Sequence, residues 1–157
     1  MTGILCMATV VAAVYFVYVA IACKGIPESL SATYYLLGNK GWLFKLVMGM
    51  TGLLLLPVWV SVSEECLQHL AFFACGGLLF TAVAPAFRLK LEGAVHYSAA
   101  VVCCVSAILW QVMEGLWDIT LFFAILGWVC YLQWKNWCFW LEVAVTGSVM
   151  ANLWRLE

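Results

Sequence analysis

The chain has 157 residues, of which 67% are hydrophobic and only 10% are charged, and its formal net charge at pH 7 is −1. Soluble domains are about half apolar and about a quarter charged, so a soluble protein of this length could not cover so much apolar surface. Nucleic-acid binding is disfavoured because it needs a concentrated lysine and arginine footprint, and the sequence contains no basic run. We therefore expect an integral membrane protein whose partner is the lipid bilayer.

Six apolar segments divide the chain. Each has about 17–22 residues, which is enough to cross about 30 Å of hydrocarbon at about 1.5 Å per residue. We predict one all-α domain, a bundle of about six transmembrane helices. The first segment lacks the basic start of a signal peptide, so we expect it to be retained. The predicted spans are 4–23, 42–62, 67–87, 94–113, 116–134 and 137–153.

A polar loop, residues 24–41, follows the first span. Pro27 suits the first position of a helix and Gly38 suits a C-terminal cap, so residues 27–37 predict a short helix at the membrane interface. The alternative is a re-entrant or irregular segment between the spans, which is allowed only where protein or water satisfies its backbone. The loop is rich in hydroxyl groups, from Ser29, Ser31, Thr33, Tyr34 and Tyr35.

Tryptophans fall near the ends of the predicted spans, as expected for rings that favour the headgroup level. Basic residues predict the orientation, because loops one, three and five carry them and loops two and four do not. The positive-inside rule then places the odd loops in the cytoplasm and both termini outside it, in an inner membrane. One predicted belt holds Trp42, Trp134, Trp137 and Trp140, and the other holds Trp59, Trp110, Trp117 and Trp154. The loop cations are Lys24, Lys40, Arg88, Lys90 and Lys135.

Two charged residues fall slightly inside the hydrocarbon. Lys45 lies three residues past Trp42 and Glu142 lies five past Trp137, so both are roughly 5–8 Å below the same interface. Pairing would offset much of the cost of burying these charges. We predict a contact between Lys45 and Glu142. The alternative for Lys45 is that its side chain extends to the interface.

Glu92 and His96 are four residues apart at the start of the fourth span and share a helix face. A carboxylate beside an imidazole can relay protons or help to hold a cation. Tyr97 adds a hydroxyl on the neighbouring face. The alternative is a hydrogen-bonded histidine at an interfacial helix start.

The spacing of ligand residues predicts no metal site and no cofactor. His69 and His96 lie on opposite sides of the predicted bundle, which excludes a two-histidine zinc site. The eight cysteines form no CxxC pair, and most lie inside apolar runs, where free cysteine behaves as a small hydrophobe. Cys6 and Cys66 would lie on the same side, and a disulfide between them is left open.

Small residues mark predicted helix contacts at 74–77, 98–100 and 144–151. Such spacings let helix backbones approach closely. Packing within the monomer is the expected use, and the seam of a homo-oligomer is the alternative.

The block PESLSATYY, followed after two spans by AP and then by EGAVHYSAA, resembles a pattern of small bacterial membrane proteins of unknown function. It is loosely similar to the six-span Frag1/DRAM-like and related families, over residues 27–100. The resemblance implies no reaction, and such proteins are usually drawn with the first loop outside, whereas the lysines here place it inside. The family-like positions are Glu28, Ser31, Tyr34, Tyr35, Pro85, Glu92, His96 and Tyr97.

The predicted topology gathers many polar side chains toward one leaflet, and polar groups inside membrane bundles usually mark a functional cavity. We expect a non-enzymatic protein with a cytoplasm-facing cavity that binds or translocates a small solute, a proton or a lipid headgroup. One alternative is an intramembrane lipid-modifying enzyme that uses His96 and Glu92, and another is a structural or partner-binding subunit. The candidate cavity residues are Glu28, Ser31, Tyr34, Tyr35, Lys45, Glu92, His96, Tyr97 and Glu142.

Overall fold

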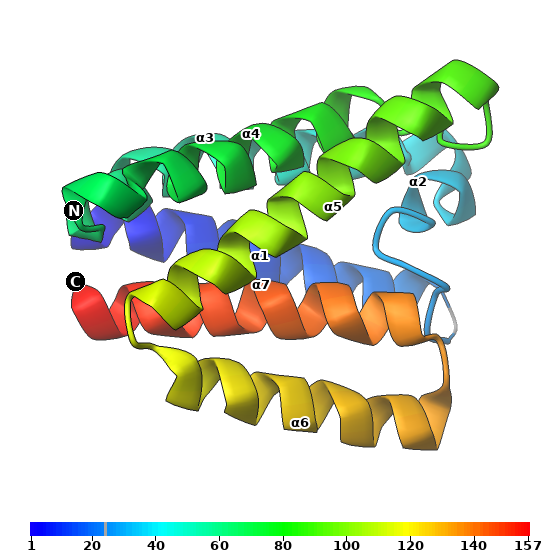
Figure 1. The fold of residues 1–157 in the computed structure, drawn as a ribbon. Coiled ribbons are helices and arrows are strands. Elements are labelled where there is room, and N and C mark those ends of the chain that lie inside the picture. The colour runs from blue at the N-terminus through cyan, green and yellow to red at the C-terminus, as the bar shows by residue number, and fades with distance from the viewer. Residues whose placement is uncertain (24) are drawn as a thin grey trace.

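The computed structural model describes residues 1–23 and 25–157. Lys24, one of the cations behind the predicted orientation, lies outside the described residues. Six long helices run back and forth between the two ends of the bundle, and one of them, α5, crosses the others obliquely (Figure 1). They are α1 (Thr2–Ala22), α3 (Trp42–Val62), α4 (Gln68–Val83), α5 (Lys90–Met113), α6 (Trp117–Trp134) and α7 (Trp137–Leu156). The short elements are α2 (Thr33–Leu36), η1 (Gly38–Lys40) and η2 (Glu65–Leu67). Because the described ranges contain no strand, the predicted all-α fold is confirmed.

Five helices in the described ranges are long and apolar enough to cross a membrane: α1, α3, α4, α5 and α6. These five are compatible with a multi-pass membrane protein. α7 has the length but is not among them, since it carries Glu142 and Asn152. α4 ends at Val83, earlier than the predicted residue 87, because Pro85 disfavours helical backbone at the preceding Ala84 and has no N–H for a helix hydrogen bond.

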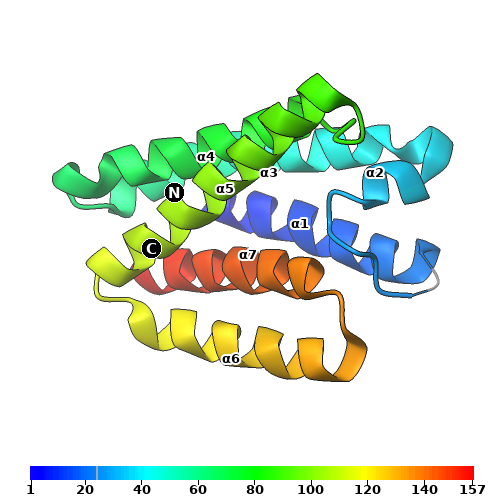
Figure 2. The same ribbon diagram turned by 45° about the vertical axis from the view of Figure 1, so that its right-hand side comes forward.

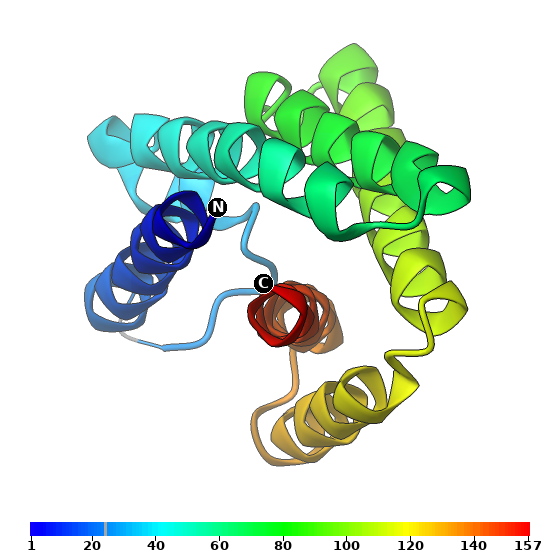
Figure 3. The ribbon, with the colours of Figure 1, turned by 90° about the vertical axis from the view of Figure 1, so that its left-hand side faces the viewer.

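The less apolar α7 contacts four of the other long helices. It packs against α6 along its length and also contacts α1, α3 and α5. Viewed along the helices, α7 lies between α1 and α5, whereas α6 lies at the periphery (Figure 3). Only Gly127 of α6 is buried. The helix that carries polar side chains is therefore shielded by protein, while α6 presents an apolar surface of the kind that lipid covers.

Both termini lie at one end of the bundle, and loops one, three and five lie at the other (Figures 1 and 2). The Met1 amino group pairs with the Glu157 carboxylate and holds the pKa of that carboxyl below its ordinary value. At the opposite end, the Arg88 backbone N–H donates to the Tyr35 hydroxyl, which joins loops three and one. We call this the loop-one end. An even number of antiparallel helices produces this arrangement.

One of the two predicted tryptophan belts is partly wrong. Trp117 and Trp154 are exposed near the terminal end, but Trp59 and Trp110 are buried within the bundle. Their rings pack edge to face with centroids 5.1 Å apart. The Trp110 Nε1–H donates to the Ser63 hydroxyl at 2.8 Å, so this polar group finds its partner inside the protein rather than among lipid headgroups.

A glycine sets the closest approach of α4 and α5. A Cβ added at Gly77 would lie 2.6 Å from the Ala99 carbonyl oxygen and 2.8 Å from the Cys103 nitrogen. Gly77 belongs to the small-residue segment 74–77, which the sequence predicts to be a helix contact. The structure confirms this contact within the monomer.

Candidate functional site

Loop one enters the bundle rather than lying on the interface. Only Thr33–Leu36 is α-helical, so the predicted interfacial helix over 27–37 is largely wrong. Leu30, Ser31 and Thr33 are buried, and the segment before α2 is irregular. The re-entrant alternative describes this loop better. Such a segment needs internal partners for its backbone groups, because hydrocarbon offers none.

Side chains of α7, of the turn between α6 and α7, and of α2 supply those partners. The Leu30 N–H donates to Glu142 Oε2 at 2.6 Å, and the Asn136 amide donates to the Ile26 carbonyl at 2.8 Å. The Thr33 hydroxyl donates to the Leu30 carbonyl at 2.5 Å. Since that bond uses the only hydroxyl hydrogen of Thr33, the Tyr15 hydroxyl must donate to Thr33 Oγ1, at 2.5 Å. These bonds fix the loop against α1 and α7.

Glu142 lies at the centre of this arrangement. It is in the second turn of α7, where its carboxylate accepts a hydrogen bond from the Leu30 N–H, and it lines a cavity together with Ser31. An ionised carboxylate is costly to remove from water unless hydrogen bonds or a proton compensate for the lost hydration. The Leu30 N–H of loop one provides part of that compensation here.

A small cavity adjoins the Glu142 carboxyl group where loop one meets α3, α4, α5 and α7. Its volume is about 70 Å³, and its walls are mostly apolar, with Ser31 and Thr81 among the polar exceptions. A water molecule occupies about 30 Å³ in the liquid, so the cavity has room for about two of them. It is too small for a sugar or a lipid headgroup.

The predicted contact between Lys45 and Glu142 is wrong. Lys45 is exposed on α3, and its Nζ lies 5.6 Å from the centre of the Tyr34 ring. No ion pair joins it to Glu142, whose carboxylate instead accepts a bond from the Leu30 N–H of loop one. Lys45 is near a helix end, where its long side chain reaches the surface at lower cost than it could enter the bundle.

The predicted Glu92–His96 pair is not formed. His96 is buried, with 2% of its surface exposed, and its Nδ1–H donates to the Ala84 carbonyl at 2.9 Å. Its ring packs against Phe87, with centroids 5.1 Å apart. Ala84 follows the end of α4, so its carbonyl needs a donor from elsewhere. Neither hydrogen bond nor ion pair joins Glu92 to His96, and Tyr97 points outward with 59% of its surface exposed.

The other predicted residues lie near the loop-one end but outside the small cavity. Tyr34 and Tyr35 pack edge to face at 5.1 Å. The Arg88 guanidinium lies 4.4 Å from the centre of the Tyr35 ring. Glu28 is exposed and lines a separate surface pocket that also contains Arg88. Of the nine candidates, only Ser31 and Glu142 meet at the small cavity.

Four residues with polar or thiol side chains line the cavity without having been predicted: Thr81, Cys103, Cys104 and Thr146. Thr146 follows Glu142 by one helical turn and therefore shares its face, so this position could have been found from the sequence. The cysteines resemble ordinary apolar residues of a span, and nothing in their spacing indicates that they line a cavity with a carboxylate.

A second polar cluster, also absent from the predictions, joins α5, α6 and α7 toward the terminal end. The Asn152 amide and the Thr120 hydroxyl both donate to Gln111 Oε1 at 2.9 Å. Gln111 Nε2 donates to the Ala107 carbonyl at 3.1 Å. Gln111 and Asn152 are fully buried, and Asn152 Oδ1 has no partner among the described residues. We call this group the amide cluster.

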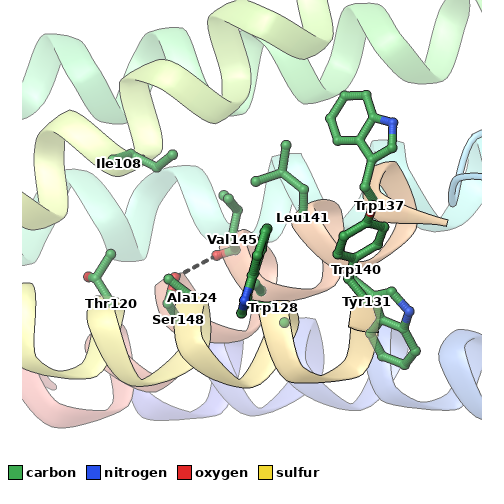
Figure 4. Close-up of a pocket in the computed structure, with 12 residues that line it drawn as sticks. Ile108, Thr120, Ala124, Trp128, Tyr131, Trp137, Trp140, Leu141, Val145 and Ser148 are labelled. Atoms are coloured by element: carbon green, nitrogen blue, oxygen red, sulfur yellow. Dashed lines mark hydrogen bonds between the residues drawn. The ribbon is translucent and has the colours of Figure 1, made fainter. Parts of the chain in front are cut away.

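A larger groove between α6 and α7 is apolar and differs in character from the small cavity. It has a volume of about 310 Å³ and is lined mainly by aromatic and aliphatic side chains, with Trp128 and Tyr131 on α6 (Figure 4). Ser148 points toward it, but its hydroxyl already donates to the Val145 carbonyl at 3.0 Å. The groove offers no charged group, so it is not the candidate site.

Comparison with known proteins adds no relative. No protein-family model, curated protein or solved structure matches the chain. The resemblance to Frag1/DRAM-like families therefore stays a prediction, and the function must be inferred from the residues that meet around Glu142.

Proposed function

We propose that this chain is a multi-pass membrane protein that binds and translocates protons, and that Glu142 is the group that takes up and releases the proton. One observation carries the proposal: a carboxyl group on α7, which four other long helices contact, adjoins a cavity with room for about two water molecules. Ionisable residues inside membrane bundles are expensive to keep, and they commonly mark proton or ion pathways.

The surroundings of Glu142 favour a proton over a larger solute. The cavity of about 70 Å³ is smaller than a sugar or a lipid headgroup. A bound metal ion would need several oxygen, nitrogen or sulfur ligands, whereas Glu142 is the only carboxylate among the described residues that line the cavity. A proton needs only one carboxylate oxygen and a hydrogen-bonded route of water or hydroxyl groups.

The polar groups of α7 support a route between the two ends of the bundle. Glu142 lies near the loop-one end and Asn152 lies ten residues further along, which corresponds to about 15 Å of helix. Asn152 belongs to the amide cluster, and Ser106 and Ser148 are buried polar residues on α5 and α7 between these two positions. We place the loop-one end in the cytoplasm, on the basis of its lysines and arginine.

The enzymatic alternative has less support from the geometry. Acid–base catalysis requires the reacting groups within hydrogen-bond reach of a substrate and of each other. His96 is committed to the Ala84 carbonyl and is almost wholly buried, and Glu92 does not contact it. A lipid-modifying reaction that uses this pair would need a different arrangement of α5.

Proton flux into liposomes tests the proposal. The purified protein is reconstituted with a pH-sensitive dye inside the vesicles, a pH gradient is imposed, and the membrane potential is clamped with valinomycin and potassium. We expect the natural protein to dissipate the gradient faster than empty liposomes, and Glu142→Gln to reduce the rate to that of the empty vesicles. Glutamine keeps an oxygen acceptor for the Leu30 N–H but cannot release a proton at any accessible pH.

Glu65→Gln is the matched control, because Glu65 is an exposed glutamate at the terminal end. This variant should conduct as the natural protein does. Thermal unfolding of each variant shows whether the fold is intact. A folded Glu142→Gln protein that conducts normally would overturn the proposal and leave Glu142 as a support for loop one. A natural protein no faster than empty liposomes would also overturn it.

A further inference from the structure

A second pocket at the loop-one end lies apart from Glu142 and is open to the surface. Its volume is about 250 Å³, and it is formed by the end of α1, loop one, α2 and the turn between α4 and α5. Two of the described residues that line it are charged and of opposite sign, Glu28 and Arg88. The pocket is thus large enough for a small polar group and presents both charges to it.

The two charged side chains are not neutralised by each other. The charged groups of Glu28 and Arg88 do not lie within 4.0 Å of each other, and neither forms an ion pair with another described residue. The guanidinium is held in place from one side, since it lies 4.4 Å from the centre of the Tyr35 ring. The Tyr35 hydroxyl also accepts a bond from the Arg88 backbone N–H at 3.0 Å. Arg88 is therefore pre-positioned while its N–H donors stay available.

The position of the pocket relates it to the membrane surface. It lies beside Cys23, which follows the last residue of α1, and beside Arg88, two residues before α5 begins. Apolar side chains, including Ile26 and the exposed Leu36, line it together with the two charges. This combination fits a ligand that is charged at one end and apolar at the other, and that approaches from the interfacial layer.

We propose that this pocket binds the headgroup of a zwitterionic phospholipid with a primary ammonium, the phosphoethanolamine class. The phosphate would accept hydrogen bonds from the Arg88 guanidinium, whose fork geometry suits phosphate oxygens. The ammonium would donate to the Glu28 carboxylate. A primary ammonium fits better than choline, because choline is recognised by open aromatic faces and the Tyr35 ring is already covered by Arg88.

This proposal is independent of the proton function, because it uses neither Glu142 nor the small cavity. The test is native mass spectrometry of the purified protein in detergent with equal amounts of phosphatidylethanolamine, phosphatidylcholine and phosphatidylglycerol. An ion pair of about 1 kcal/mol with Glu28 predicts about fivefold more ethanolamine lipid than choline lipid on the natural protein. Charge-assisted bonds of about 1.5–3 kcal/mol predict a loss of about tenfold or more in total lipid for Arg88→Gln.

Two further variants separate the roles of the charges. Glu28→Gln changes an exposed residue and should keep the phosphate contact, so ethanolamine and choline lipids should bind about equally. Lys90→Gln removes a nearby exposed cation that does not line the pocket, and should bind as the natural protein does. Equal binding of all three lipids by the natural protein, or an unchanged preference in Glu28→Gln, would overturn the proposal. Displacement of the lipid by water-soluble phosphoethanolamine at a matched concentration would overturn its assignment to a membrane lipid.

Discussion

The contact between α4 and α5 at Gly77 predicts a large effect from a single methyl group. In Gly77→Ala the new Cβ would lie 2.6 Å from a backbone oxygen of α5, about 0.8 Å short of the 3.4 Å at which ordinary contacts begin. Backbone atoms cannot rotate away as a side chain can, so the two helices must separate. Overpacking of this kind costs about 1–3 kcal/mol, which corresponds to a fall of roughly 2–12 °C in the unfolding midpoint for a chain of this length.

The neighbouring glycine provides the control. A Cβ added at Gly76 meets nothing within 4 Å, so Gly76→Ala should keep the midpoint or raise it, since alanine favours helix by up to about 1 kcal/mol over glycine. Circular dichroism during heating in detergent measures both variants. If Gly77→Ala unfolds at the same temperature as Gly76→Ala, the close approach of α4 and α5 is refuted.

Three further predictions concern buried bonds and topology. Glu142→Ala should lower the free energy of unfolding by about 1–3 kcal/mol, because the buried Leu30 N–H loses its acceptor. Glu142→Gln should lower it much less. Equal losses for the two variants in thermal unfolding would contradict this prediction. Trp110→Phe and Ser63→Ala should each lower the free energy of unfolding by about 0.5–1.5 kcal/mol, and the double variant should lower it by less than the sum of the two. Strict additivity would mean that the 2.8 Å hydrogen bond between Trp110 and Ser63 contributes nothing to stability. With the native cysteines replaced, Asn39→Cys should react with a membrane-impermeant maleimide only from the cytoplasmic side and Glu65→Cys only from the other. Reaction of both from one side would refute the topology.

Much of the fold follows from the sequence because the bilayer constrains it strongly. Apolar segments of about 20 residues can cross a membrane only as helices, so composition and length predict the element type and the approximate bounds. Short links between them predict antiparallel neighbours, and hence termini at one end. Composition does not determine which face of a helix turns inward. This is why Trp59 and Trp110 were assigned to a belt although they form part of the core.

The candidate site was predicted less well than the fold. The sequence identified Glu142 as a charge that needs a partner, but it assigned that partner to Lys45 by depth alone. Depth is one coordinate of position, and the rotation of each helix about its axis is another that a single sequence does not provide. The actual partner is a backbone N–H of loop one, which no side-chain pattern can reveal. The Glu92–His96 pair failed for a similar reason, because the unsatisfied carbonyl of Ala84 competes for the imidazole.

The neighbouring helices allow α7 to carry polar side chains inside the bundle. A helix that faced lipid on most sides could not keep Glu142 and Asn152 without a large insertion cost. α7 can hold both residues because α1, α3, α5 and α6 all contact it. The Leu30 N–H of loop one also donates a hydrogen bond to the Glu142 carboxylate. Asn152 is fully buried, whereas Glu142 is part-buried beside the small cavity. A carboxyl group that is part-buried, hydrogen-bonded on one side and next to a water-sized cavity on the other is suited to exchanging a proton, which is the property that the flux measurement tests.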